Sequence, residues 1–166
     1  MNQHNKALFT RTHRTLFAVA WLLLLASFAA ALYGIHTLPD TIATHFTLDG
    51  TPDEYGSPTT LLILPAIMTV CLGTISLVAY MVPPEQWNIP FSVPEQCRTA
   101  VWRDMLSMLA ALELEIGAFT LFATLQSLSQ RFVGAMIACC VLLAAVTLTV
   151  ILALRRAKRH SRTHEN

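Results

Sequence analysis

Two acids, Glu113 and Glu115, lie inside a long apolar stretch of the sequence. Residues two apart on a helix are about 200° apart around its axis, so the two carboxyls cannot share one face. An ionised acid in the middle of a membrane costs on the order of 3 kcal/mol or more. Each acid should therefore carry a proton or bind a polar side chain. The candidate partners are Ser27, Thr69, Ser76 and Thr147.

These acids have a functional and a structural interpretation. A proton or cation relay would need acids inside the membrane, and such acids often mark functional sites. The alternatives are a protonated glutamate that joins neighbouring helices, and a third helix that is shifted or tilted so that one acid reaches water. Glu113 is in line with Ala110 and Gly117, and small residues at this spacing favour close helix packing.

The polar segment Leu38–Pro58 contains acids but no Lys or Arg, and it carries the second set of chemically interesting side chains. His45, Asp49, Asp53 and Glu54 are of types that bind metals, yet their spacing fits no recognised motif, the EF-hand included. Asp49 is better suited to a turn, and Asp53 and Glu54 to solvent. We predict no metal site and no cofactor.

Motifs of common enzymes are missing from the sequence. There is no glycine-rich phosphate loop, no HExxH metal motif and no nucleophile elbow. Most of the histidines lie in the expected tails and loops. The sequence therefore predicts a protein with no catalytic residues and no enzymatic activity, and we expect no nucleic-acid partner.

Four apolar runs must position these side chains. The chain is 54% hydrophobic and only 13% charged, which is unusual for a soluble domain. Each run is long enough to cross a membrane, which takes about 20 helical residues, and lipid leaves the backbone no other form than helix. The sequence predicts an all-α membrane protein with a four-helix transmembrane bundle. The runs are Thr15–Ile35, Leu61–Val82, Met105–Leu128 and Phe132–Leu154.

The Lys and Arg residues concentrate on one side of these runs. They occur before the first run, between the second and third, and after the fourth, with Arg131 as the exception. Because cytoplasmic loops of membrane proteins are enriched in Lys and Arg, both termini are predicted to be cytoplasmic and the segment Leu38–Pro58 extracytoplasmic. Four cations near the C-terminus should bind lipid headgroups. These are Arg155, Arg156, Lys158 and Arg159.

This topology divides the chain into five segments. Two helical hairpins are separated by a proline-rich cytoplasmic loop and flanked by cytoplasmic tails, the second of them basic. The segments are the tail 1–14, the hairpin 15–82, the loop 83–103, the hairpin 104–154 and the tail 155–166.

Residues 37–58 of the first hairpin are predicted to form a short, ordered extracytoplasmic loop. Gly34 and Pro39 should end the first helix, because proline cannot continue one. A strand-like segment, a tight turn and an ordered return to the membrane should follow. Ser57 then suits the cap of the second helix, with Pro58 at its first position.

The same loop carries the residues of a family pattern. A leucine-proline pair, an isoleucine, a His-Phe pair, a glycine, an acid near an aromatic and a closing Gly-Ser follow one another. They are Leu38, Pro39, Ile42, His45, Phe46, Gly50, Asp53, Tyr55, Gly56 and Ser57. Together with the flanking helices, at about residues 16–75, this segment resembles the bacterial membrane family called domain of unknown function 1648. The family usually has a lysine after the Gly-Ser pair, where this chain has Pro58.

The resemblance implies a multi-pass protein of the bacterial inner membrane. The best-known members are immunity and signalling proteins of a sporulation-delaying toxin system, which implies a peptide ligand at the outer face and a cytoplasmic regulator. We therefore expect sensing, immunity or signalling through the extracytoplasmic loop. The alternatives are a small proton- or cation-coupled transporter, or a subunit of one, and a structural assembly module. Membrane lipid and a second copy of the chain are the other expected partners.

Overall fold

Four long helices form a bundle in the computed structural model, which describes residues 3–47, 51–130 and 132–162. They are α2 (Arg11–Thr37), α3 (Ile63–Met81), α4 (Arg98–Leu128) and α5 (Phe132–Arg162). Each belongs to a segment that is long and apolar enough to cross a membrane. The prediction of an all-α membrane protein with a four-helix bundle is confirmed.

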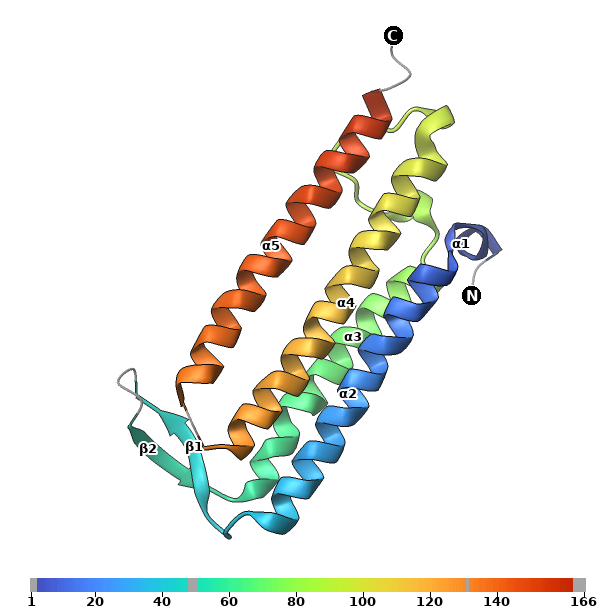
Figure 1. The fold of residues 1–166 in the computed structure, drawn as a ribbon. Helices are drawn as coiled ribbons and strands as arrows, with labels where there is room; N and C mark the ends of the chain where they lie inside the picture. Colours follow the sequence, from blue (N-terminus) through green and yellow to red (C-terminus); the bar gives the residue numbers. More distant parts are fainter. Residues whose placement is uncertain (1–2, 48–50, 131, 163–166) are drawn as a thin grey trace.

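Shorter elements cover the two ends of this bundle (Figure 1). The beginning of α2 and the end of α5 lie at one end, here called the terminal end. Two strands lie at the opposite end, the hairpin end, and pair as an antiparallel sheet. The strands are β1 (Ile42–Phe46) and β2 (Pro52–Gly56). The other short elements are α1 (Gln3–Leu8) and the 3-10 turns η1 (Pro58–Leu62), η2 (Pro84–Gln86) and η3 (Glu95–Cys97).

Helix α4 is the central element, because it packs along α2, α3 and α5. It lies directly against the backbone of α2 at Gly117, where a Cβ atom would be 2.8 Å from the main-chain oxygen of Ala20. Ala110, two turns earlier on the same face, is fully buried. The small residues in line with Glu113 therefore allow two helix backbones to approach closely, as the sequence pattern indicated.

Two helices extend further at the terminal end than the sequence suggested. The loop expected over 83–103 ends earlier, because α4 begins at Arg98 directly after the turn η3. The segment expected as a basic tail from residue 155 continues α5 as far as Arg162. Arg, Lys and Ala are good helix formers, and no proline or glycine interrupts this segment. Ala157 is also buried in a cluster with Cys97 and Val101, which fixes this turn of α5 against α4.

The segment 1–14, expected as a tail, is folded onto the bundle over its described residues. The Asn5 side chain donates hydrogen bonds of 2.9 Å to the main-chain oxygens of both Ala79 and Val82. Carbonyls in the last turn of a helix have no partner within that helix, so Asn5 supplies one to the end of α3. Phe9 stacks on Tyr80 at a centroid distance of 4.5 Å, which adds apolar contact to this polar one.

Gly34 does not end the first helix, which continues to Thr37. Leu38 is its C-cap, and Pro39 follows, as expected for a residue that cannot continue a helix. Gly34 instead fills a packing position, since a Cβ atom there would overlap the side chains of Leu128 and Leu61. This glycine allows the ends of α2 and α4 to meet beneath the β-hairpin.

Candidate functional site

The β-hairpin is irregular, and its irregularity presents a polar pair to solvent. The strands pair Ile42 with Gly56 and Phe46 with Pro52, with shifts in register on both sides of His45. Such bulges turn side chains away from strict alternation. His45 Nδ1 lies 2.6 Å from Oδ1 of Asp53, although the sequence suggested that Asp53 was solvated.

The Asp53 carboxylate changes the pKa of His45. The hydrogen bond from His45 to the Asp53 carboxylate, and the negative charge of that carboxylate, raise the pKa of His45 above its usual value of 6.5. The two side chains are 62% and 41% exposed, so water and salt screen the attraction. The pair is therefore an exposed, titratable link between β1 and β2.

Because His45 titrates, we predict that the stability of the β-hairpin depends on pH. A histidine whose pKa is higher in the folded state contributes stability below its unfolded pKa of about 6.5, and this stability is lost as the pH rises through the folded pKa. We expect the His45 ring resonances to titrate above pH 6.5 in NMR spectra, together with the amides of β1 and β2. Asp53→Asn should lower that titration midpoint towards the usual value. An unchanged midpoint in this variant would contradict the pairing.

Gln130 connects the hairpin to the end of α4. Its Oε1 accepts a 2.9 Å hydrogen bond from the main-chain N–H of Ala43, and its Nε2 donates to the carbonyl of Ser127 at 2.6 Å. Its backbone has a φ of 53°, in the left-handed region that often follows the end of a helix. This role could not be predicted from the sequence, because a glutamine after an apolar run is ordinary.

A cavity of about 360 Å³ lies beneath the hairpin, and it is called the hairpin cavity below. Strand β1 lines one side, including Ile42 and Thr44, and the beginning of α3 and the end of α4 line the others. The volume falls in the range of small-ligand sites. Its walls are mainly apolar, but Thr44, Thr60, Thr124 and Ser127 add hydroxyl groups.

The residues of the family pattern divide into two groups. Ile42 is buried with Ala31 and Leu61, and Leu38 packs against them. Gly56 leaves space for Thr44, whose Cγ2 atom would be 3.0 Å from an added Cβ atom. These positions shape the loop.

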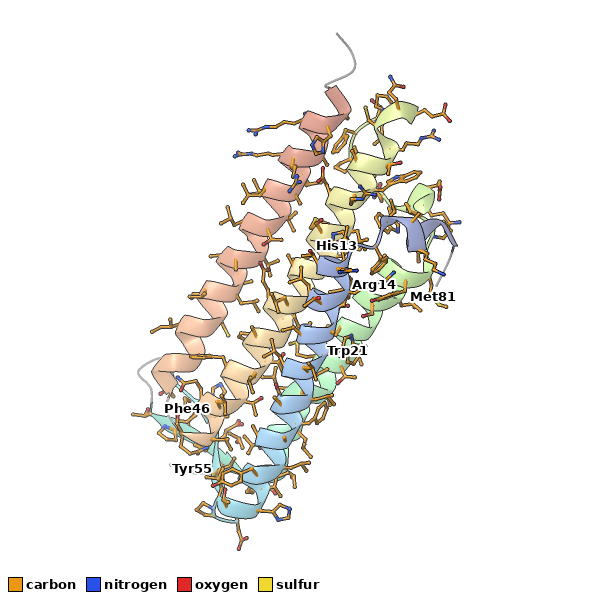
Figure 2. All side chains as sticks on the ribbon, turned by 45° about the vertical axis from the view of Figure 1, so that its right-hand side comes forward. His13, Arg14, Trp21, Phe46, Tyr55 and Met81 are labelled. Carbon is orange, nitrogen blue, oxygen red and sulfur yellow. The ribbon has the colours of Figure 1, made fainter. Side chains whose placement is uncertain are left out.

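Ser57 also has a structural role, because its hydroxyl accepts the Thr59 N–H at the start of η1. In the second group, Phe46 is half-buried, whereas Tyr55 is 64% exposed (Figure 2). With His45 and Asp53, Tyr55 forms the outward-facing part of the pattern. Gly50 and the turn expected around it lie outside the described residues.

Comparison with family models matches residues 22–69 to the family described as Domain of unknown function (DUF1648). These residues form a DUF1648 domain. It covers most of α2, the β-hairpin, η1 and the beginning of α3. No curated protein and no solved structure matches the chain. The resemblance inferred from the loop residues is therefore confirmed at the level of the family.

Glu113, outside the DUF1648 domain, is fully buried among three helices. Its Oε1 accepts a 2.6 Å hydrogen bond from the Ser76 hydroxyl of α3, and Ser76 in turn accepts one of 3.1 Å from Trp21 Nε1 of α2. Figure 2 shows Trp21 on the part of α2 that lies beside α3. Within the described part of the chain, Oε2 of Glu113 has no hydrogen-bond partner. This network joins α2, α3 and α4.

Of the four polar partners considered from the sequence, Ser76 is the one bonded to a glutamate. The other three hydroxyls donate to carbonyls of their own helices: Ser27 to Leu23, Thr69 to Pro65 and Thr147 to Leu143.

Glu115 faces the opposite side of α4, as a separation of about 200° requires. Its Oε1 accepts a 2.5 Å hydrogen bond from the Thr149 hydroxyl of α5. Glu115 also lines a cavity of about 400 Å³ between α4 and α5, called the intramembrane cavity below. The two acids therefore belong to separate sites. Glu113 is buried among packed helices, whereas Glu115 lines the intramembrane cavity.

Asp104 anchors α5 to α4 at the terminal end. It is only 6% exposed, and its two oxygens lie 3.0 Å from Arg156 Nε and 2.6 Å from His160 Nδ1. Arg156 lies one helical turn before His160, which lets both reach this acid. Its side chain is still 70% exposed, so the lipid contact expected for it stays a prediction. Arg155, Lys158 and Arg159 are exposed, and a lipid contact for them stays a prediction.

No group of three His, Cys, Asp or Glu side chains is arranged to bind a metal within the described ranges. The sites with distinctive geometry are the exposed hairpin pair, the hairpin cavity, and the two intramembrane acids. Of these, the pair and the hairpin cavity belong to the DUF1648 domain.

Proposed function

We propose that this protein is a sensing or immunity protein of the bacterial inner membrane that recognises a peptide through its β-hairpin. The observation that carries this proposal is the attachment of a solvent-exposed hairpin to α4 by Gln130, beside a cavity open to a ligand. A hairpin that only connected two helices would need neither the cross-strand pair nor this attachment.

Charge supports the orientation in this proposal. The Lys and Arg residues of α1, α2 and α4, and those at the end of α5, belong to the terminal end. The positive-inside rule places that end in the cytoplasm and the hairpin outside. Figure 2 shows Arg14 and Met81 near the terminal end, and Phe46 and Tyr55 at the hairpin end.

The chemistry of the hairpin favours a cationic, extended peptide. Asp40, Asp53 and Glu54 give this segment negative charge, and opposite charge speeds encounter and improves selectivity. The side chains of Pro52 to Tyr55 are exposed, so β2 is accessible to a peptide that adds as a further strand. The hairpin cavity then offers an apolar pocket for one side chain of such a peptide.

Helix α4 connects the β-hairpin to the terminal end and could transmit a signal between them. A peptide that shifts β1 would act on the end of α4 through Gln130. At the other end of the same helix, Asp104 sets the position of α5 and its cationic turns. A cytoplasmic regulator that docks there would respond to a change in the hairpin.

A growth experiment tests the proposal. Cells that lack the gene should become sensitive to cationic peptides from culture medium of competing or sister cells, and the wild-type gene should restore resistance. His45→Ala and Asp53→Ala should lose at least about tenfold in protective effect, as expected for interface residues worth more than 1.4 kcal/mol. His36→Ala is the matched control, since His36 is exposed at the end of α2 and belongs to neither the pair nor the cavity. Equal protection by all three variants would overturn the proposal.

A second candidate function is a small cation-coupled transporter or a subunit of one. The observation that favours it is Glu115, an acid that lines a cavity inside the membrane-spanning region. In vesicles that contain the purified protein, Glu115→Gln should abolish a proton or cation flux that the wild type shows. No flux in the wild type at any pH would remove this candidate.

A further inference from the structure

The intramembrane cavity is lined by apolar side chains and one carboxyl group. Its walls are apolar and aromatic, with Ala118 and Phe119 of α4 on one side and Val141 and Leu142 of α5 on the other. One ionisable group, the carboxyl of Glu115, interrupts them. A volume of about 400 Å³ is within the range of small-molecule sites.

Only one of the two carboxyl oxygens of Glu115 has a hydrogen-bond partner among the described residues. Oε1 accepts the hydroxyl hydrogen of Thr149, but Oε2 is buried and has no hydrogen-bond partner among the residues that the structure describes. A buried carboxyl oxygen without a partner costs free energy, and the cost is larger when the group is charged. A cationic donor that enters the cavity would remove this cost.

The rim of the cavity faces the hydrocarbon layer. Phe122 and Val141 are 47% and 61% exposed on segments long and apolar enough to span the membrane, and Ile137, just before the second of these, is 55% exposed. A ligand therefore reaches Glu115 from the lipid and must itself be soluble in lipid. The faces of Phe119 and Phe122 would also attract a cation, as aromatic rings do.

We infer that the intramembrane cavity binds a lipophilic ammonium ion, with its charged nitrogen at Glu115 and its hydrocarbon part among the apolar side chains of α4 and α5. Glu113 offers no comparable site, because it is fully buried and is not among the described residues that line the intramembrane cavity. The inference is independent of the hairpin's proposed role and requires no transport.

Binding of tritiated decylamine to the full-length protein in nanodiscs tests this inference. Scintillation proximity should show saturable binding to the wild type, displaced by unlabelled decylamine but not by 1-decanol. Glu115→Gln keeps the size of the side chain and should weaken binding by about tenfold or more, as expected for a lost charged hydrogen bond. Glu113→Gln is the matched control and should bind decylamine as the wild type does.

A second variant covers the case in which Glu115→Gln does not fold. Ala118→Trp keeps the acid and fills the cavity from its rim, so it should also prevent saturable binding. Equal displacement by decylamine and 1-decanol would show an apolar cavity with no role for the acid. That result, or unchanged binding in both Glu115→Gln and Ala118→Trp, would overturn the inference.

Discussion

Gly117→Leu is expected to destabilise the bundle by about 3 kcal/mol, because overpacking a close helix contact forces backbone shifts. The first carbon of a side chain at this position would lie 2.8 Å from the main-chain oxygen of Ala20 and 3.2 Å from its Cα. These are backbone atoms of another helix, so no rotamer change can relieve the overlap. Thermal unfolding of the purified protein in detergent, followed by tryptophan fluorescence, measures the loss.

Gly73→Leu is the matched control for this prediction. Gly73 is also a glycine within a membrane-spanning helix, but a Cβ atom there would have no described neighbour within 4 Å. Leucine is a better helix former than glycine by about 1 kcal/mol, so this variant should be as stable as the wild type or more stable. An equal loss in both variants would show that glycine serves helix flexibility rather than close packing.

Asp104→Ala is expected to destabilise the protein by about 2 kcal/mol, since it removes two charged hydrogen bonds from a buried acid. Without the carboxylate, Arg156 and His160 lose their partner at the terminal end of α5. Hydrogen exchange measured by mass spectrometry should show the last turns of α5 exchanging faster, while the β-hairpin is unchanged.

The pair formed by Glu95 and Arg98 supplies the control. These side chains are 3.8 Å apart and are 87% and 48% exposed, so Glu95→Ala should change stability by less than about 0.5 kcal/mol. A double-mutant cycle of Asp104→Ala with Arg156→Ala should give a clear coupling energy. A coupling close to zero would contradict a contribution from the Arg156 pair and would leave His160 as the partner of Asp104.

The features that the sequence revealed are those set by local patterns. Apolar runs predicted four membrane helices, since only helices satisfy their backbone in lipid. Pro39 and Ser57 marked where helices end and begin, and the loop between them carried enough family residues to identify the DUF1648 domain. The relative positions of Glu113 and Glu115 followed from the geometry of a single helix.

The features that it did not reveal depend on residues far apart in the chain. Asn5 and Ala79, Ala43 and Gln130, and Asp104 and His160 each meet only after the helices pack. Neither partner in such a pair has an unusual neighbourhood in the sequence. For the same reason, the sequence indicated that an acid needs a partner without indicating which helix supplies Thr149 to Glu115.

The central position of α4 has a consequence for biosynthesis. The ribosome makes α2 and α3 first, yet α2 packs more extensively against α4 than against α3. Before α4 is made, the backbone of α2 at Ala20 and the hydroxyl of Ser76 lack the partners that Gly117 and Glu113 of α4 provide. A chain in which only α2 and α3 have been made therefore lacks most of the helix contacts of the complete bundle.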